Sequence, residues 1–123
     1  MDRRKRLGEF GEEAAAAHLI RSGHRLLARR WRCARGEIDL ITRDGRALVF
    51  VEVRTRRAGA PGLAEESVGP AKRVRLVDLA YAYLSATGSQ EESWRIDVVA
   101  VDVDRAGRIT RIHHIPNAVE DVS

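Results

Sequence analysis

The chain has 123 residues, of which 44% are hydrophobic, so it is long enough for one domain with one buried core and too short for two. Its net charge of +4 favours an anionic partner such as nucleic acid, because a basic surface releases counterions from a phosphate backbone. The single cysteine excludes an internal disulfide, and without an apolar run or leader we expect a cytoplasmic protein that does not enter the membrane.

The first expected element is a helix over Gly8–Arg21. It contains the alanine run Ala14–Ala17 and no proline, and Gly23 follows as a helix terminator. Apolar residues lie around most of its circumference, which indicates packing on more than one side. We expect a single domain over residues 1–123, with 1–6 and 117–123 as its flexible ends.

Three strands are expected after this helix. Arg25–Cys33 mixes apolar and basic residues and is the first of them, and Ile38–Thr42 is the second. The Asp44-Gly45 pair is a strong signal for a tight turn, and the apolar, β-branched stretch Ala47–Val53 follows it. The region Glu37–Arg54 is therefore predicted to be a β-hairpin.

The second half begins with a loop. Arg56–Gly69 is rich in Gly, Ala and Pro without periodicity, and loops of this length are often functional. Pro70 suits the first position of a second helix, which Gly88 ends. Arg95–Asp102 is expected to be a buried strand, and Ile109–Ile115 a last strand at the edge of the sheet.

The expected order of elements is α-β-β-β-α-β-β, which indicates an α/β or α+β fold with helices flanking a mixed central sheet. The second helix connects the strand Ala47–Val53 to the strand Arg95–Asp102. A crossover helix of this kind allows the two strands to run parallel.

The hairpin sets the relative positions of Asp39 and Glu52. If the Asp44-Gly45 pair forms a two-residue loop, the pairs counted outward place Asp39 opposite Phe50, and Asp39 and Glu52 become diagonal neighbours on one face. Diagonal partners have Cβ atoms about 7–8 Å apart or less, a distance that one hard cation between two carboxylates can bridge. Arg54 joins the same face by the period of two.

Glu52 lies in a strand that is apolar on both faces, where an unpaired acid is unfavourable, so it must have a partner. That partner is either a metal ion or, in the purely structural alternative, Arg54 or Arg35 in a salt bridge. Glu37 is either a third metal ligand or an acid that pairs with an arginine.

The chain also contains the segments LGEFGEEAAAAHL, GEIDLI, LVFVEVR, SVGPAKRVRLVDLAYAYL and WRIDVVAV. Together they resemble the YraN-like family of uncharacterised bacterial proteins, which are regarded as relatives of archaeal Holliday junction resolvases. The resemblance covers about Gly8–Val101. It implies a restriction-endonuclease-like core with a PD-(D/E)xK site, in which Asp39 and Glu52 bind Mg²⁺ or Mn²⁺ and Glu12 matches an acid that resolvase-like members add. Arg54 stands where the motif has lysine, and arginine is a poor proton acceptor.

Two helical residues have their own alternatives. Glu12 is either a surface acid that complements the helix dipole or, because it shares a stripe with Ala16 and Leu19, an acid with a specific partner in the site. Lys72 lies in the first turn of the second helix, where the dipole disfavours a cation. It either supplies the amine that Arg54 lacks or is a surface lysine.

The residues and the resemblance together predict a metal-dependent endonuclease that acts on DNA, including branched structures, by attack of a metal-activated water on a phosphodiester. The metal would be Mg²⁺ or Mn²⁺, with Asp39 and Glu52 as its ligands. The expected catalytic residues are Glu12, Asp39, Glu52, Arg54 and Lys72. A homodimer would suit a two-fold branched substrate.

Arginine-rich segments indicate where nucleic acid would bind. Basic side chains cluster in three segments, Arg3–Arg6, Arg29–Arg35 and Arg54–Arg57. From these clusters the residues expected to contact nucleic acid are Arg35, Arg56 and Arg57. The alternative function is a nuclease-fold module without catalysis, which binds nucleic acid or a protein partner.

Overall fold

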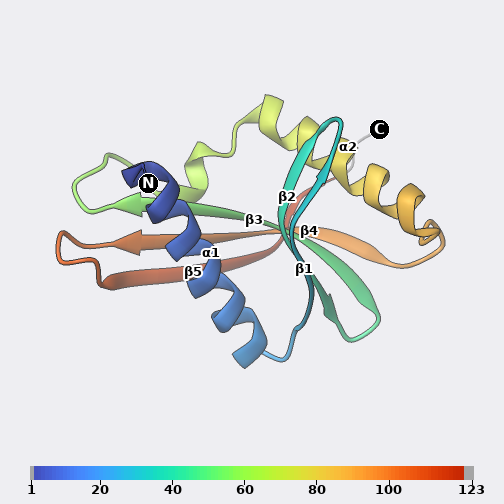
Figure 1. Ribbon diagram of the computed structural model, residues 1–123, viewed down its shortest axis with the longest axis horizontal. Coiled ribbons are helices and arrows are strands. Elements are labelled where there is room, and N and C mark those ends of the chain that lie inside the picture. The colour runs from blue at the N-terminus through green and yellow to red at the C-terminus, as the bar shows by residue number, and fades with distance from the viewer. Residues whose placement is uncertain (1, 121–123) are drawn as a thin grey trace.

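The computed structural model describes residues 2–120. Two helices and five strands follow one another as α-β-β-β-α-β-β, which confirms the order expected from the sequence, and a short 3-10 helix precedes the second helix. The elements (Figure 1) are α1 (Arg3–Arg21), β1 (Arg25–Cys33), β2 (Gly36–Asp44), β3 (Ala47–Arg57), η1 (Ala64–Ser67), α2 (Pro70–Thr87), β4 (Trp94–Val103) and β5 (Ile109–Val119).

The five strands form one mixed sheet in the order β1-β2-β3-β4-β5. β3 and β4 run parallel, and the other neighbouring pairs run antiparallel. α2 lies between β3 and β4 in the chain, so it is the crossover that parallel pairing needs, as predicted. β5 lies at one edge of the sheet, which was also predicted.

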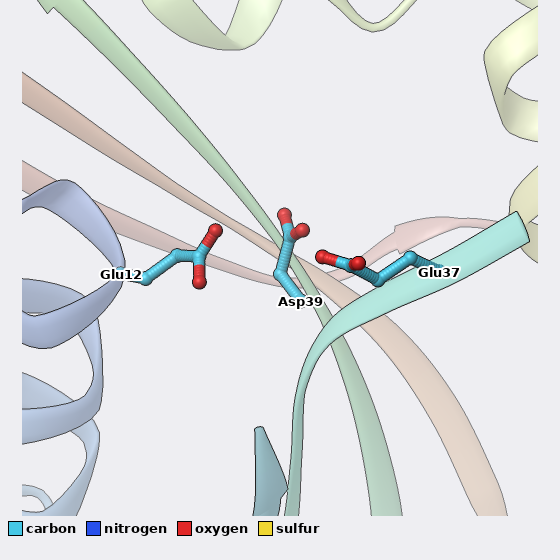
Figure 2. A group of neighbouring side chains, drawn as sticks. All are labelled: Glu12, Glu37 and Asp39. Atoms are coloured by element: carbon cyan, nitrogen blue, oxygen red, sulfur yellow. The ribbon is translucent and has the colours of Figure 1, made fainter. Parts of the chain in front are cut away.

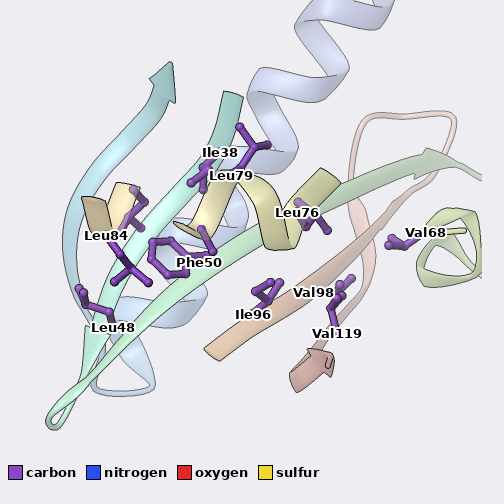
Figure 3. Close-up of a cluster of buried hydrophobic side chains, with 12 residues drawn as sticks. Ile38, Leu48, Phe50, Val68, Leu76, Leu79, Leu84, Ile96, Val98 and Val119 are labelled. Atoms are coloured by element: carbon purple, nitrogen blue, oxygen red, sulfur yellow. The ribbon is translucent and has the colours of Figure 1, made fainter. Parts of the chain in front are cut away.

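One helix covers each face of the sheet. Leu19 of α1 packs with Val49 and Val51 of β3 on one face. Leu79 of α2 packs with Phe50 on the opposite face, in the cluster that Figure 3 shows. Alternate residues of β3 therefore enter different clusters, as the two-residue period of a strand requires. Burial on both faces explains why the first half of β3, Ala47–Val51, is apolar throughout.

The first helix begins earlier and the last strand ends later than the sequence predicted. α1 begins at Arg3 rather than Gly8, because the side chain of Asp2 accepts a hydrogen bond from the Arg4 amide at 2.9 Å and caps the first turn. β5 extends to Val119. Parts of both ranges expected to be flexible thus belong to a helix and a strand, while residues 1 and 121–123 lie outside the described part of the chain.

The β2–β3 hairpin has a different register from the one predicted. Its two loop residues are Gly45 and Arg46, so Ile41 pairs with Phe50, two positions away from the predicted partner. Gly45 has a φ of 59° at the first loop position, where type II′ loops favour glycine. Because the displacement is an even number of residues, every side chain keeps its predicted face of the sheet.

A buried polar cluster lies on β4 and β5. Asp97 is fully buried and accepts hydrogen bonds from Arg95 Nε at 3.0 Å, from the Asn117 amide at 2.8 Å and from a histidine, His114, at 2.7 Å. Asp97 thus has three partners, and none of them belongs to the acidic pocket. No helix among residues 2–120 has both the length and the apolar character that a membrane span needs.

Candidate functional site

An acidic site lies where β2 and β3 stop pairing. Their last paired residues toward this end are Leu40 and Val51. Beyond this point the amide of Val53 donates a hydrogen bond at 2.8 Å to Oδ2 of Asp39, a side-chain oxygen, in place of a strand–strand bond. One further step along the two strands brings Asp39 to Glu52, so the two acids are direct neighbours rather than the diagonal ones expected.

Both acids line a pocket of about 570 Å³ that is built from β2, β3, η1 and the two helices. The pocket combines acidic and basic side chains with a few apolar ones. The lining residues are Arg4, Leu7, Gly8, Glu12, Asp39, Glu52, Val53, Arg54, Thr55, Arg56, Ser67 and Lys72. All five residues that the sequence assigned to catalysis are therefore brought together.

Glu12 of α1 and Glu37 and Asp39 of β2 point toward one another (Figure 2). One carboxylate oxygen from each lies within 4.8 Å of the others, close enough for one cation to contact all three. Each of the three side chains is partly buried. Hard oxygen donors of this kind suit Mg²⁺ or Mn²⁺ and do not suit metals that prefer thiolates.

Two of these acids are held by arginines of β1. Arg30 donates from Nε to Oε1 of Glu12 at 2.8 Å, and Arg32 donates from Nε to Oε2 of Glu37 at 2.7 Å. The alternative that Glu37 pairs with an arginine is thus what the structure shows, and the same carboxylate still reaches the acidic group. The Arg30 and Arg32 side chains are 44% and 78% exposed, so these pairs fix orientation more than they add stability.

Asp39 differs from the other acids of the site, because it forms no ion pair with any residue from 2 to 120. Burial, followed by the charge of the neighbouring Glu52, raises the pKa of the Asp39 carboxyl to about 8. The hydrogen bond from the Val53 amide opposes this rise without cancelling it. Asp39 is thus a carboxyl group among like charges that lacks a compensating cation.

Glu52 is 3% exposed and has two cationic partners. Its Oε2 lies 3.2 Å from Lys72 Nζ and 3.3 Å from Arg54 Nη1. Arg54 also donates from Nε to Oγ of Ser67 at 2.7 Å, which fixes the guanidinium between β3 and η1. Among the described residues Arg35 is exposed and is not a partner of Glu52, so that version of the salt-bridge alternative is wrong.

A close contact between α1 and β3 sets the depth at which Glu12 enters the site. Gly11 is buried against Thr55, and a Cβ on Gly11 would lie 1.8 Å from the Oγ1 atom of Thr55. Only a residue without a side chain allows the helix to come this near. Since Glu12 is the next residue, its carboxylate reaches Asp39 as a consequence of this contact.

The three arginines expected to contact nucleic acid lie in different places. Arg56 lines the acidic pocket and donates to the backbone carbonyl of Pro61. Arg57 is the exposed last residue of β3. Arg35 is exposed in the turn before β2 and does not line the pocket. The structure therefore brings Arg56 to the acids and leaves Arg35 outside.

Sequence reasoning missed Arg4 and Ser67, which both line the pocket. The basic run Arg3–Arg6 was visible, but a helix expected to start at Gly8 gave no reason to place it near the acids. Ser67 lies in a segment without periodicity, and no sequence signal pointed to it.

A family model described as "Uncharacterised protein family UPF0102" matches residues 11–101, a range that contains all the acids of the site. A UPF0102 protein of Roseiflexus castenholzii is 53% identical over 120 residues, which is 97% of each chain. One of Pelotomaculum thermopropionicum is 49% identical over 117 residues, or 95% of this chain and 98% of the relative. One of Syntrophus aciditrophicus is 42% identical over 120 residues, or 98% and 93%. These similarities extend over almost the full length of both partners.

Proposed function

The chain belongs to the protein family UPF0102, and we propose that its acidic pocket is the active site of a metal-dependent endonuclease that cleaves DNA, branched structures included. One observation carries the proposal. Carboxylates from α1 and β2 converge within 4.8 Å of one another, and the pocket that contains two of them also contains four basic side chains. Phosphodiester hydrolysis by a metal-dependent nuclease needs carboxylates that hold the cation and basic side chains that hold the phosphate.

The donor set fits a hard divalent cation. Glu12, Glu37 and Asp39 offer carboxylate oxygens alone, and Asp39 has no basic partner among residues 2–120. A cation beside Asp39 would offset the repulsion that raises the pKa of its carboxyl. When bound there, Mg²⁺ or Mn²⁺ would activate water for attack and neutralise charge on the phosphate.

Lys72 and Arg54 have separate tasks in this proposal. Glu52 holds Lys72 Nζ at 3.2 Å, so the amine is fixed inside the pocket, where it orients the attacking water and offsets charge on the phosphate. Arg54 is bound to Glu52 and Ser67, and its planar guanidinium contacts the phosphate without exchanging a proton. Lys72, which comes from α2, thus takes the place of the lysine that the motif has at position 54.

The arrangement around Glu52 also favours the second candidate, a binding module without catalysis. Two cations already neutralise Glu52, so this acid is satisfied without a metal. In that case the pocket would bind nucleic acid through Arg4 and Arg56 and would cleave nothing.

A cleavage assay separates the two candidates. Linear, flapped and four-way DNA is incubated with Mg²⁺ or Mn²⁺ and the wild-type protein, with Asp39→Asn, or with Asp78→Asn. Asp39→Asn keeps an oxygen that can accept the Val53 hydrogen bond and removes the charge. Asp78→Asn makes the same change at an exposed position of α2. We expect metal-dependent cleavage by the wild type and the Asp78 variant and none by the Asp39 variant.

If the wild type cleaves none of these substrates with either metal, the endonuclease proposal fails and the binding module takes its place. Cleavage that persists in Asp39→Asn would place the activity outside this pocket.

A further inference from the structure

A channel of basic side chains continues from the acidic pocket along the first turns of α1. A cavity of about 340 Å³ shares Arg4 and Arg56 with the acidic pocket. Another cavity, of about 370 Å³, shares Arg3 and Arg57 with the cavity of 340 Å³. Leu7 lines all three, so the cavities adjoin one another. We call the two added cavities the basic trough, defined by Arg3, Arg4, Arg6, Arg56 and Arg57.

Most arginines of the trough have no partner within the fold. Four of them have side chains that form no hydrogen bond or ion pair with any residue from 2 to 120. These are Arg3, Arg4, Arg6 and Arg57. By contrast, Arg95 and Arg111 on the other side of the sheet centre are held by carboxylates at 3.0 and 2.9 Å. Among residues 2–120, no acid lines either cavity of the trough. The trough therefore offers positive charge that the folded chain does not use.

The position of this charge is unfavourable for the helix itself. The first four residues of α1, Arg3–Arg6, are all basic, and the first turn contains no acid beyond its cap, Asp2. The positive end of the helix dipole disfavours cations at this place. An anionic ligand would offset both the dipole and the mutual repulsion of the arginines.

The far cavity of the trough also contains an exposed aromatic ring. Phe10 is 41% exposed and lines this cavity together with Arg3, Arg6 and Arg57. Proteins bind unpaired nucleotides with this combination, because the base stacks on a flat apolar ring while basic groups contact the phosphates. A base in an intact duplex is already stacked between its neighbours and cannot reach such a ring.

We propose that this cavity binds an unpaired nucleotide of a single-stranded segment, whose backbone follows the basic trough to the acidic pocket. The base stacks on Phe10, and Arg3, Arg6 and Arg57 contact the phosphates. The proposal rests on the proposed function, since both take nucleic acid as the ligand. It adds a substrate class, namely DNA with a single strand beside the cleaved bond, as in a flap or a fork.

Binding of labelled oligonucleotides in EDTA tests this proposal without any cleavage. Fluorescence anisotropy compares a short single strand with a blunt duplex for the wild type, Phe10→Ala, Phe10→Trp and Ile20→Ala. Loss of one stacked base should weaken single-strand binding by about tenfold or more in Phe10→Ala, while duplex binding changes by less than about twofold. Phe10→Trp should keep the wild-type affinity. Ile20 is exposed on the same helix and lines none of these cavities, so Ile20→Ala should change nothing.

The salt dependence of binding supplies a second test. Arg57→Ala should reduce the slope of log affinity against log salt by about 0.7 for the single strand, the value of one lost phosphate contact. Arg75→Ala, which removes an exposed arginine of α2 outside the trough, should leave this slope unchanged.

The proposal is overturned if Phe10→Ala leaves single-strand binding unchanged, or if it weakens single strand and duplex equally. If Phe10→Ala loses only self-association in size-exclusion chromatography, Phe10 is a protein contact and the proposal is also overturned. Because EDTA removes the metal, the result is independent of the endonuclease. If Phe10→Ala weakens single-strand binding but the wild type shows no metal-dependent cleavage, the endonuclease is refuted and this binding site is retained. If the wild type cleaves but Phe10→Ala binds the single strand normally, the endonuclease is retained and this binding site is refuted.

Discussion

At the scale of single residues, the carboxyl of Asp39 favours metal binding but lowers the stability of the metal-free fold at neutral pH. Its carboxyl has a pKa of about 8 in the folded chain, above the 3.8 of an unperturbed aspartate. The folded protein therefore holds this proton more tightly than the unfolded chain does. The stability contribution of Asp39 is complete below pH 3.8 and is lost as the pH rises toward 8.

Replacing this ionisable carboxyl by a neutral amide should stabilise the metal-free protein at neutral pH, because folding no longer requires an acid that is ionised in the unfolded chain to take up a proton. We expect Asp39→Asn to raise the free energy of unfolding at neutral pH by about 1 kcal/mol or more, because one pKa unit corresponds to about 1.4 kcal/mol. The same variant should lose the stabilisation that Mn²⁺ gives the wild type. Urea unfolding with and without Mn²⁺ measures both effects, and a destabilised Asp39→Asn would show that the acid is satisfied within the fold.

The same pKa predicts how metal affinity depends on pH. Since a cation must displace the proton of Asp39, binding should release protons at neutral pH and should become tighter as the pH rises toward about 8. Calorimetric titration of Mn²⁺ in buffers with different ionisation enthalpies counts the released protons. An affinity that is constant from pH 6 to 8 would exclude Asp39 as a ligand.

Lys72 and Arg54 make different predictions for catalysis. Because Lys72 Nζ is held 3.2 Å from Glu52, Lys72→Ala should slow cleavage by about 10²–10³-fold, the cost of a lost group that stabilises charge in the transition state. Arg54→Lys should change the rate little, since an amine is already present. Rates measured under single-turnover conditions decide the matter. If instead Arg54→Lys accelerates cleavage strongly, the amine of Lys72 does not serve this role.

At the scale of elements, the approach of α1 to β3 depends on Gly11. Gly11→Ala should destabilise the fold despite the better helix propensity of alanine, because its Cβ would meet the Thr55 side chain. Gly8→Ala is the matched control, since no atom lies within 4 Å of its Cβ position, and it should stabilise the fold by about 0.5–1 kcal/mol. Thermal unfolding of both variants compares them, and equal effects would mean that this contact does not restrain the helix.

The elements also show how far sequence reasoning extends. The hairpin and its acids could be predicted, because a two-residue period keeps Asp39 and Glu52 on one face in any register that shifts by an even number. The register itself depended on whether Gly45 takes the first or the second loop position, and both are known glycine positions. The separation of β2 from β3 on the N-terminal side of Leu40 leaves no trace in the composition of either strand.

At the scale of the whole molecule, the site combines both faces of the sheet. α1 brings Glu12 from one side, and α2 brings Lys72 from the other, so the two meet where β2 and β3 have separated. The sequence could indicate each residue as a candidate from its own helix. Their convergence could not be predicted from one chain, because it depends on packing between elements that are far apart in sequence. The approach of Glu37 to Glu12 agrees with the alternative in which Glu37 is a further metal ligand, which the sequence left open.

The most direct test of the central claim is the anomalous scattering of Mn²⁺ in crystals of the wild-type protein. The account predicts one strong peak in contact with Asp39 and with at least one further acid of the site, and no such peak in crystals of Asp39→Asn. The absence of a peak beside Asp39 in the wild type, or a peak that persists unchanged in Asp39→Asn, would contradict it.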